Sequence, residues 1–429
     1  MSINEDQLEQ YCIETFEDID YEYILGTELE ERESPTQVVL QQRLQDSIYK
    51  LNKDLPNSAR EQAINQLLRI DTPDLLLQNQ YVHNLLVKGV TVTYFDKGEN
   101  KSDIVRLIDF ENPENNDFLV VNQYTVIEGI GHQKRNRRPD IVVFLNGLPL
   151  VVIELKNPAD EKTEIEDAYN QLQTYKQDIP SLFRYNELLV ISDGLEAQAG
   201  SLSANFERFI PWRTIDGDTE AAPNQWQIEI LIRGLLHPAR LLDYIRYFIT
   251  FEDDGSNLIK KSAAYHQFHA VNRAVSESVR ATAEKGDSKI GVVWHTQGSG
   301  KSLTMLFYSA KIIQLLNNPT ILVLTDRNDL DGQLFNTFAL SRDLLRDEPK
   351  QAQDRLEIRE LLKTTGGGVI FSTIQKFLPG EDETEYPVLT ERKNVIVIAD
   401  EAHRSQYSFQ KSAKVTYNKE EKMEDIAIK

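Results

Sequence analysis

Short apolar runs bounded by glycine, proline and charged residues predict strands in two stretches of the chain. These runs occupy residues 90–95, 118–121, 141–145, 150–156 and 188–192 in the first stretch, and 290–294, 320–325, 369–371 and 395–399 in the second. Residues 1 to about 70 are acidic, with a mostly helical pattern. The second set of runs alternates with helical segments, which is typical of a parallel sheet with crossover helices. We therefore predict an α/β protein with a mixed first domain and a mostly parallel second one.

Polar, turn-rich segments divide the chain into domains. Residues 218–224 and 251–255 are rich in acidic residues, with proline or glycine, and predict joints between domains. Leucines and isoleucines at helical spacing lie between them. We predict a first domain over residues 1–217, a helical linker over 218–256 and a second domain over 257–429.

Charged side chains interrupt the apolar hairpin of the first domain. Asn146-Gly147 is a turn signal between its two strands, and folding the chain there brings Asp140 nearly opposite Glu154. Lys156 lies two residues beyond Glu154 and therefore on the same face. Two such carboxylates can hold Mg²⁺, which activates water and stabilises charge on a phosphodiester, and the lysine can orient that water. The alternative is an exposed strand end without catalytic function.

Two further features flank this hairpin. The helical segment after residue 163 places Gln171 and Tyr175 on one face, four residues apart. Before the hairpin, a dense basic run offers contacts to phosphate or forms a solvated loop; its cations are Lys134, Arg135, Arg137 and Arg138.

The second domain contains two motifs for a nucleoside triphosphate. A glycine-rich loop follows the first apolar run and comprises Gln297, Gly298, Ser299, Gly300, Lys301 and Ser302. A loop between a strand and a helix presents backbone N–H groups to a polyphosphate, and Lys301 and Ser302 would contact the phosphates and Mg²⁺. The run 395–399 ends in Asp400, a second Mg²⁺ ligand, and Glu401, which would polarise the attacking water. We predict ATP and Mg²⁺ as cofactors.

Composition argues against several kinds of binding site and cellular location. The formal net charge is −21 and the sequence pI about 4.9, which argues against binding nucleic acid by bulk attraction. Cys12 is the single cysteine, so disulfides within the chain and cysteine-rich zinc sites are excluded. No apolar run reaches the roughly 18 residues of a membrane span, and no signal peptide precedes the first helix. These patterns predict a cytoplasmic protein without a membrane partner.

Together the motifs resemble the restriction (R) subunit of type I restriction–modification enzymes. Pro139-Asp140 with Glu154-x-Lys156 is similar to a PD-(D/E)xK nuclease core, and Gln171-x-x-x-Tyr175 to its additional positioning motif. Thr296–Ser302 with Asp400-Glu401-Ala402-His403 is similar to a superfamily 2 translocase. The resemblance implies a restriction-endonuclease-like domain followed by a RecA-like lobe.

The resemblance also implies an activity and partners. Expected partners are duplex DNA, which the motor would translocate, and methyltransferase and specificity subunits. Gln267 corresponds to an adenine-reading residue or to a plain helix face, and Arg327, Thr373 and Lys376 to residues that contact the DNA backbone. Alternatives are a nuclease-motor of another defence or repair system, or a motor with a non-catalytic DNA-docking module. Because a second lobe does not follow, we expect a longer parent and near-background ATP hydrolysis by these 429 residues alone.

Overall fold

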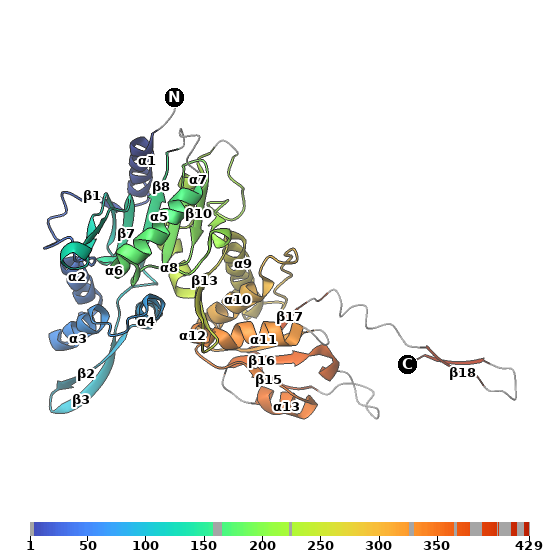
Figure 1. Cartoon of the computed structure of the whole chain (residues 1–429). Coiled ribbons are helices and arrows are strands. Elements are labelled where there is room, and N and C mark those ends of the chain that lie inside the picture. Colours follow the sequence, from blue (N-terminus) through green and yellow to red (C-terminus); the bar gives the residue numbers. More distant parts are fainter. Residues whose placement is uncertain are drawn as a thin grey trace. The chain divides into compact units, whose positions relative to one another are not determined.

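The computed structural model describes residues 4–157, 165–222, 225–325, 330–363, 367–377, 388–400, 402, 413–417 and 424–428 (Figure 1). The chain forms two compact units. The N-terminal unit contains Met1–Glu277 and Ile290–Gly300, and the C-terminal unit contains Ser278–Lys289 and Lys301–Lys429. The domain boundaries at residues 217 and 257 stay predictions, and each unit is described by itself below.

A seven-stranded mixed sheet forms the centre of the N-terminal unit. Its strands lie in the order β1-β4-β7-β8-β9-β10-β11. Their bounds are β1 (Glu22–Leu25), β4 (Phe118–Asn122), β7 (Ile141–Leu145), β8 (Leu148–Leu155), β9 (Leu188–Ser192), β10 (Ala197–Gly200) and β11 (Ile210–Pro211). Every residue of β4, β7, β8 and β9 is buried, which explains why these strands are continuous apolar runs instead of alternating patterns.

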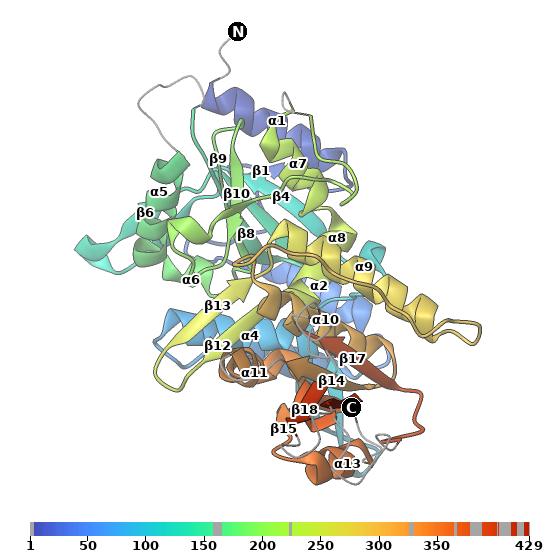
Figure 2. The same cartoon turned by 90° about the vertical axis from the view of Figure 1, so that its right-hand side faces the viewer.

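Helices cover both faces of this sheet. Figure 2 shows the sheet between α5 (Ile165–Asp178) with α6 (Pro180–Phe183) and α1 (Glu5–Glu17) with α7 (Gln227–Gly234). The first of these helices begins at Asn4, whose side chain accepts a hydrogen bond from the Gln7 backbone N–H, while the Gln7 side chain accepts from Asn4. Leu8, Cys12 and Phe16 recur every four residues along α1 and are all fully buried, so this face holds the helix on the sheet.

The remaining elements of the N-terminal unit surround the sheet. They are α2 (Gln41–Leu51), α3 (Asn57–Leu68), α4 (Leu75–Lys88), α8 (Pro238–Tyr247), α9 (Tyr265–Thr282), which continues into the C-terminal unit, and three two-stranded pairs: β2 (Val90–Asp96) with β3 (Glu99–Val105), β5 (Val126–Glu128) with β6 (Arg135–Arg137), and β12 (Ile249–Asp253) with β13 (Leu258–Ser262). The fully buried amine of Lys260 on β13 donates to the Asn79 side chain at 2.9 Å and to Glu187 at 3.1 Å. This contact fixes the last hairpin to α4 and to the start of β9.

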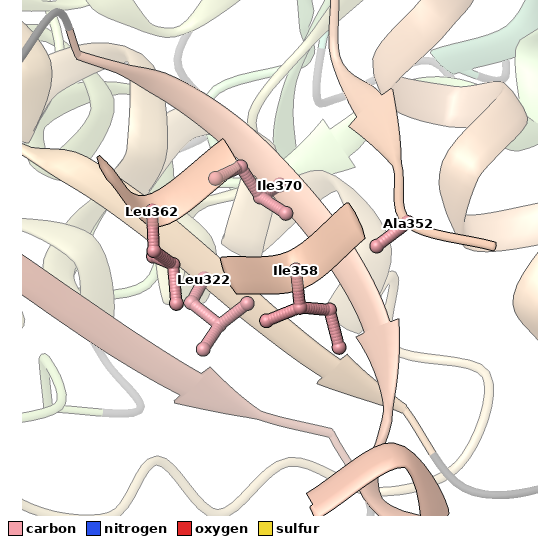
Figure 3. Packing of buried hydrophobic residues seen from close by; sticks show 5 residues of the cluster. All are labelled: Leu322, Ala352, Ile358, Leu362 and Ile370. Carbon is pink, nitrogen blue, oxygen red and sulfur yellow. The ribbon is translucent and has the colours of Figure 1, made fainter. Parts of the chain in front are cut away.

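The C-terminal unit contains a four-stranded parallel sheet in the order β15-β16-β14-β17. Its elements are α10 (Lys301–Leu315), β14 (Thr320–Thr325), α11 (Leu330–Leu340), α12 (Arg342–Leu345), β15 (Lys350–Gln351), α13 (Arg355–Lys363), β16 (Gly368–Thr373) and β17 (Val395–Ala399). Farther along the chain, β18 (Ala413–Tyr417) pairs with β19 (Glu424–Ile428). In Figure 3, Ile358 and Leu362 of α13 face Leu322 of the sheet, so one helical face covers the sheet.

The strand predicted over residues 290–294 is not formed. These residues have no strand partner in the described part of the chain, and the exposed fractions of Val292 and Trp294 are both 88%. An apolar run indicates a tendency toward burial, but a strand also requires a neighbour that supplies backbone hydrogen bonds. The prediction was therefore wrong here, whereas the predicted strands 320–325 and 395–399 coincide with β14 and β17.

Among the described helices, none is both long and apolar enough to cross a membrane.

Candidate functional site

The hairpin of β7 and β8 brings the two predicted carboxylates together. Asn146 and Gly147 both adopt positive φ, as a tight two-residue turn requires, and a Cβ on Gly147 would lie 2.5 Å from the Leu40 carbonyl oxygen. The register then shifts by one residue between Val143 and Phe144. Beyond this bulge Ile141 pairs with Ile153, so the preceding Asp140 lies opposite Glu154, as the sequence predicts.

Each of the three predicted catalytic residues contacts its neighbours. The Oδ2 atom of Asp140 accepts the Leu155 backbone N–H at 2.7 Å. The amine of Lys156 donates to Glu154 Oε1 at 3.2 Å and to the Leu155 carbonyl at 3.1 Å. Lys156 therefore shares a face with Glu154, and its positive charge lies at the end of β8 beside both carboxylates.

Burial shifts both carboxylates toward the neutral form. Desolvation is the main cause that raises the pKa of Glu154 to about 9, and the charge of Asp140 adds to it. Desolvation also raises the pKa of Asp140 to about 6, against the hydrogen bond from Leu155. The buried Oε2 atom of Glu154 has no hydrogen-bond partner among the described residues. Two buried carboxylates in their charged forms cost free energy of folding unless a proton or a cation compensates their charge.

These oxygen atoms fit a magnesium ion. Mg²⁺ binds one or two protein carboxylates and completes its octahedral shell with water and substrate phosphate. The free oxygen of Glu154 and the oxygens of Asp140 supply such a pair. Within the described residues, no three His, Cys, Asp or Glu side chains form a metal cluster, so the remaining ligands would come from solvent and substrate.

Helix α5 contacts Lys156 through Gln171. Gln171 Oε1 accepts from the Lys156 amine at 2.7 Å, and Gln171 Nε2 donates to the Tyr175 hydroxyl at 2.6 Å. That hydroxyl donates to the carbonyl oxygen of Arg138 at 3.4 Å. The two side chains predicted to share a face of the helix therefore form one hydrogen-bonded chain that begins at Lys156.

The basic run before the hairpin divides into two parts. Arg137 pairs with Asp178 at the end of α5 at 2.6 Å, and Arg135 lies 3.4 Å from the same carboxylate. Lys134 and Arg138 are exposed. The four cations therefore lie on β6 and on the residues directly before and after it. The last of them, Arg138, precedes Asp140 by two residues.

The glycine-rich loop precedes a helix as its motif requires, but the strand expected before it is absent among the described residues. Gly298 and Gly300 have φ of +85° and +81°. Ser299 bonds back to the Thr296 carbonyl oxygen at 2.7 Å, and Gln297 is exposed. Lys301 and Ser302 then form the first turn of α10.

Gln267 contacts the glycine-rich loop directly. Its side chain accepts the Ala264 backbone N–H at 2.8 Å and donates to the Gly300 carbonyl at 3.0 Å, and it is 3% exposed. The amide of Gln267 thus supports the loop in this structure, and adenine reading stays a prediction.

The parallel strands of the C-terminal unit end at a common edge. Thr325 pairs with Thr373, and Leu324 pairs with Ala399, directly before Asp400. The backbone N–H of Asp400 donates to the Leu324 carbonyl at 2.8 Å. This edge is where parallel α/β sheets bind ligands. Lys376 donates to the Ala352 carbonyl at 2.5 Å, whereas Glu401 and Arg327 lie outside the described residues.

Two family models match successive parts of the chain. Residues 2–208 match the family described as Type I restriction enzyme R protein N terminus, and residues 266–426 match the SWI2/SNF2 ATPase family. The chain is 48% identical over 419 residues to the Type I restriction enzyme HindI endonuclease subunit of Haemophilus influenzae, covering 95% of this chain and 39% of that protein. It is 37% identical to the putative type I restriction enzyme MjaIXP endonuclease subunit of Methanocaldococcus jannaschii, covering 94% of this chain and 40% of that protein.

The chain is similar to type I restriction enzyme R proteins. The R protein match takes in six of the seven strands of the N-terminal sheet, β1 to β10 in the sheet order, with Asp140, Glu154 and Lys156, and the SWI2/SNF2 ATPase match takes in α10 and the parallel sheet. The chain spans about two fifths of the length of these two curated R protein relatives.

Two residues that contact the elements of the candidate site were not predicted from the sequence. Asp178 lies seven residues after Gln171 and three after Tyr175, a spacing that places all three on one helical face and could have identified it. Asn186, whose side chain donates to the Leu150 carbonyl at 3.3 Å, had no comparable signal because its partner lies 36 residues away in sequence.

Proposed function

We propose that this chain is the nuclease and ATP-binding part of a type I restriction endonuclease subunit. In this proposal the complete protein translocates duplex DNA by ATP hydrolysis and cleaves it with Mg²⁺. The observation that carries the proposal is the contact between Lys156 and Glu154, opposite Asp140, in a chain that also contains a SWI2/SNF2 ATPase region.

The chemistry proposed for the N-terminal unit is hydrolysis of a phosphodiester. A bound Mg²⁺ supplies a water of lowered pKa and neutralises charge on the scissile phosphate. Asp140 and Glu154 would hold the cation through their carboxylate oxygens, since one of these oxygens has no protein partner within the described residues. Lys156 offsets the negative charge that develops as the water oxygen bonds to phosphorus and the bond to the sugar oxygen breaks.

Gln171 and Tyr175 have a positioning role in this proposal. Gln171 accepts from the Lys156 amine and so limits the directions in which that amine can point. Tyr175 in turn fixes the Gln171 amide, since it accepts from Nε2. Effective catalysis requires reacting groups held in one geometry, and this chain of hydrogen bonds supplies it without contacting the cation.

The proposed motor chemistry uses the two sequence motifs for a nucleoside triphosphate. Lys301 and Ser302, at the start of α10, would contact the phosphates and Mg²⁺ of ATP, and Asp400 would hold the same cation. Glu401 would polarise the attacking water, with Gln297, Gly298, Ser299 and Gly300 forming the phosphate loop. We further propose that Arg327, Thr373 and Lys376 contact the DNA backbone, and that methyltransferase and specificity subunits join the complete enzyme.

Substitutions in the complete subunit, assembled with its partners, test this proposal. Asp140→Ala, Glu154→Ala or Lys156→Ala should abolish DNA cleavage while DNA-stimulated ATP hydrolysis persists, because the two sites use different residues. Lys301→Ala should remove ATP hydrolysis and cleavage together. Lys53→Ala, at an exposed lysine outside both sites, is the matched control and should change neither activity.

The outcomes separate the two assignments. Cleavage at an undiminished rate by Lys156→Ala would show that the hairpin is not catalytic. Cleavage by the wild-type enzyme without any dependence on ATP would show that the two sites are not coupled. Failure of the wild-type protein to associate with a methyltransferase and a specificity protein would favour another defence or repair system.

A further inference from the structure

A polar pocket lies beside the catalytic residues, between β6 and α5. Its volume is about 510 Å³, and it is lined by Asn136, Arg137, Arg138, Asn170, Gln171, Thr174 and Tyr175. Gln171 and Tyr175 are the residues that connect to Lys156, so the wall of the pocket continues into the catalytic cluster. No carboxylate belongs to the lining, and its polar groups are two guanidinium groups, amides and hydroxyls.

The two arginines of the pocket are held differently. Arg137 donates from Nε to Asp178 at 2.7 Å and lies 2.6 Å from the same carboxylate through Nη2. Its Nη1 atom has no hydrogen-bond partner among the described residues, and Arg138 forms no ion pair within that same part of the chain. Asp178 therefore fixes the plane of Arg137 while one edge of the guanidinium stays available, and the side chain of Arg138 is exposed.

Along the chain, the pocket lies close to the carboxylates at which the phosphodiester bond would be cut. Arg138 precedes Asp140 by two residues, and two residues of extended chain span at most about 7 Å. This is comparable with the separation of neighbouring phosphates on one DNA strand. A strand whose scissile phosphate lies at Asp140 and Glu154 would thus place an adjacent phosphate within reach of the pocket. Arginine is well suited to a phosphate because its planar fork can donate two parallel hydrogen bonds.

We propose that this pocket binds the backbone phosphate next to the scissile one, with Arg137 and Arg138 as its cationic donors. Asp178 is a positioning residue that orients Arg137. The inference rests on the proposed nuclease function for its substrate, DNA. It separates the basic run into two donors that serve the pocket and two cations, Lys134 and Arg135, that do not line it.

DNA binding by the full chain at several salt concentrations tests the pocket. Anisotropy of a labelled duplex is measured without divalent metal, so that no cleavage occurs. Each phosphate contact contributes about −0.9 to the slope of log K against log salt concentration. Arg137→Ala and Arg138→Ala should each make this slope shallower by about 0.9, and Arg138→Lys should retain it. Arg69→Ala, at an exposed arginine outside the pocket, is the control and should bind like the wild type.

Asp178→Asn tests the positioning role separately. If Asp178 orients Arg137, the variant should bind DNA several-fold more weakly with a nearly unchanged slope. If Asp178 only offsets positive charge, its neutralisation should strengthen binding, which would overturn the positioning role.

Different experimental results would overturn the proposed phosphate pocket and the proposed nuclease function. Wild-type slopes in both arginine-to-alanine variants, or no salt-dependent DNA binding by the wild-type chain, would overturn the pocket even if Asp140→Ala abolishes cleavage. Shallower slopes in an enzyme that never cleaves DNA with Mg²⁺ would retain the pocket and overturn the nuclease function. Thermal melting of each variant, compared with Arg69→Ala, verifies that the exposed substitutions leave the fold intact.

Discussion

At the scale of single residues, the carboxyl group of Glu154 is surrounded by apolar residues of the sheet. This environment disfavours its charged form. Glu154 is fully buried on β8, and burial raises its pKa to about 9. Burial also raises the pKa of Asp140, to about 6, so the protonated form of this carboxyl group is favoured as well. The protonated forms therefore stabilise the fold at low pH, and this contribution is lost as the pH rises through these values.

Glu154→Gln should remove most of this pH dependence. Without metal, the melting temperature of the wild-type chain should fall as the pH rises from about 5 to about 9, and the variant should show a much smaller fall. Under the proposed metal site, Mg²⁺ should restore more stability at about pH 8 than at about pH 6 in the wild type, because a ligand of the folded state alone stabilises it. Thermal unfolding with and without Mg²⁺ measures both effects. A wild-type melting temperature insensitive to Mg²⁺ at every pH would contradict the metal site.

At the scale of elements, the bulge in β8 decides which side chain lies opposite Asp140. With the two-residue turn alone, Asp140 would pair with Ile153, but one extra residue on β8 shifts the pairing to Glu154. The carbonyl of Leu150, in the bulged part of β8, accepts from the Glu187 backbone N–H at 2.7 Å and from the Asn186 side chain at 3.3 Å. The turn before β9 thus holds the register of the hairpin.

Asn186→Ala should therefore affect both stability and cleavage. Asn186 is fully buried and also donates to the Leu188 carbonyl, so its loss should lower the free energy of unfolding by about 1–3 kcal/mol. Cleavage should fall as well, because the Asp140–Glu154 pairing depends on the bulge. Asn65→Ala removes a comparable bond on the exposed surface of α3 and should cost less than about 0.5 kcal/mol. Denaturant unfolding compares the two; equal effects would mean that Asn186 does not support the bulge.

The sequence predicted the hairpin, its turn and the face of α5 because each depends on residues close together in the chain. Asn146-Gly147 requires positive φ whatever surrounds it, and Gln171 and Tyr175 are one helical turn apart. The bulge depends on Asn186 and Glu187, which are far from Leu150 in sequence, so no local pattern indicates it. Residues 290–294 are the opposite case, in which a clear local pattern lacked the neighbouring strand that it needs.

At the scale of the whole molecule, segments that follow the last strand of the seven-stranded sheet in sequence pack against the elements that surround this sheet. The ring of Trp226 lies 5.5 Å from that of Tyr11 in α1, and Arg233 of α7 pairs with Asp18. Lys260 inserts its amine beside Glu187, which also accepts from His83 at 2.9 Å. These contacts all lie within the N-terminal unit.

A polypeptide of residues 1–277 should accordingly fold, whereas residues 1–217 should not fold stably. The shorter polypeptide lacks Lys260 and leaves Glu187 buried with only His83 as its ionic partner. Removing one partner of a buried ion pair costs about 3–5 kcal/mol, a large part of the 5–15 kcal/mol of a typical domain. Circular dichroism with chemical denaturation compares the two polypeptides. Equal, cooperative unfolding would mean that 218–277 is a dispensable linker.

The exposed indole of Trp294 has a practical consequence for spectroscopy. The chain has three tryptophans; Trp212 is buried and Trp226 half-buried, whereas Trp294 is 88% exposed, two residues before the loop Thr296–Ser302. An indole in water emits at longer wavelength than a buried one, so the red edge of the emission spectrum comes mainly from Trp294. Addition of nucleotide should change the intensity there, and Trp294→Phe should abolish the change. Such a change would make Trp294 a fluorescent reporter within the chain itself, with which nucleotide binding could be titrated without a label.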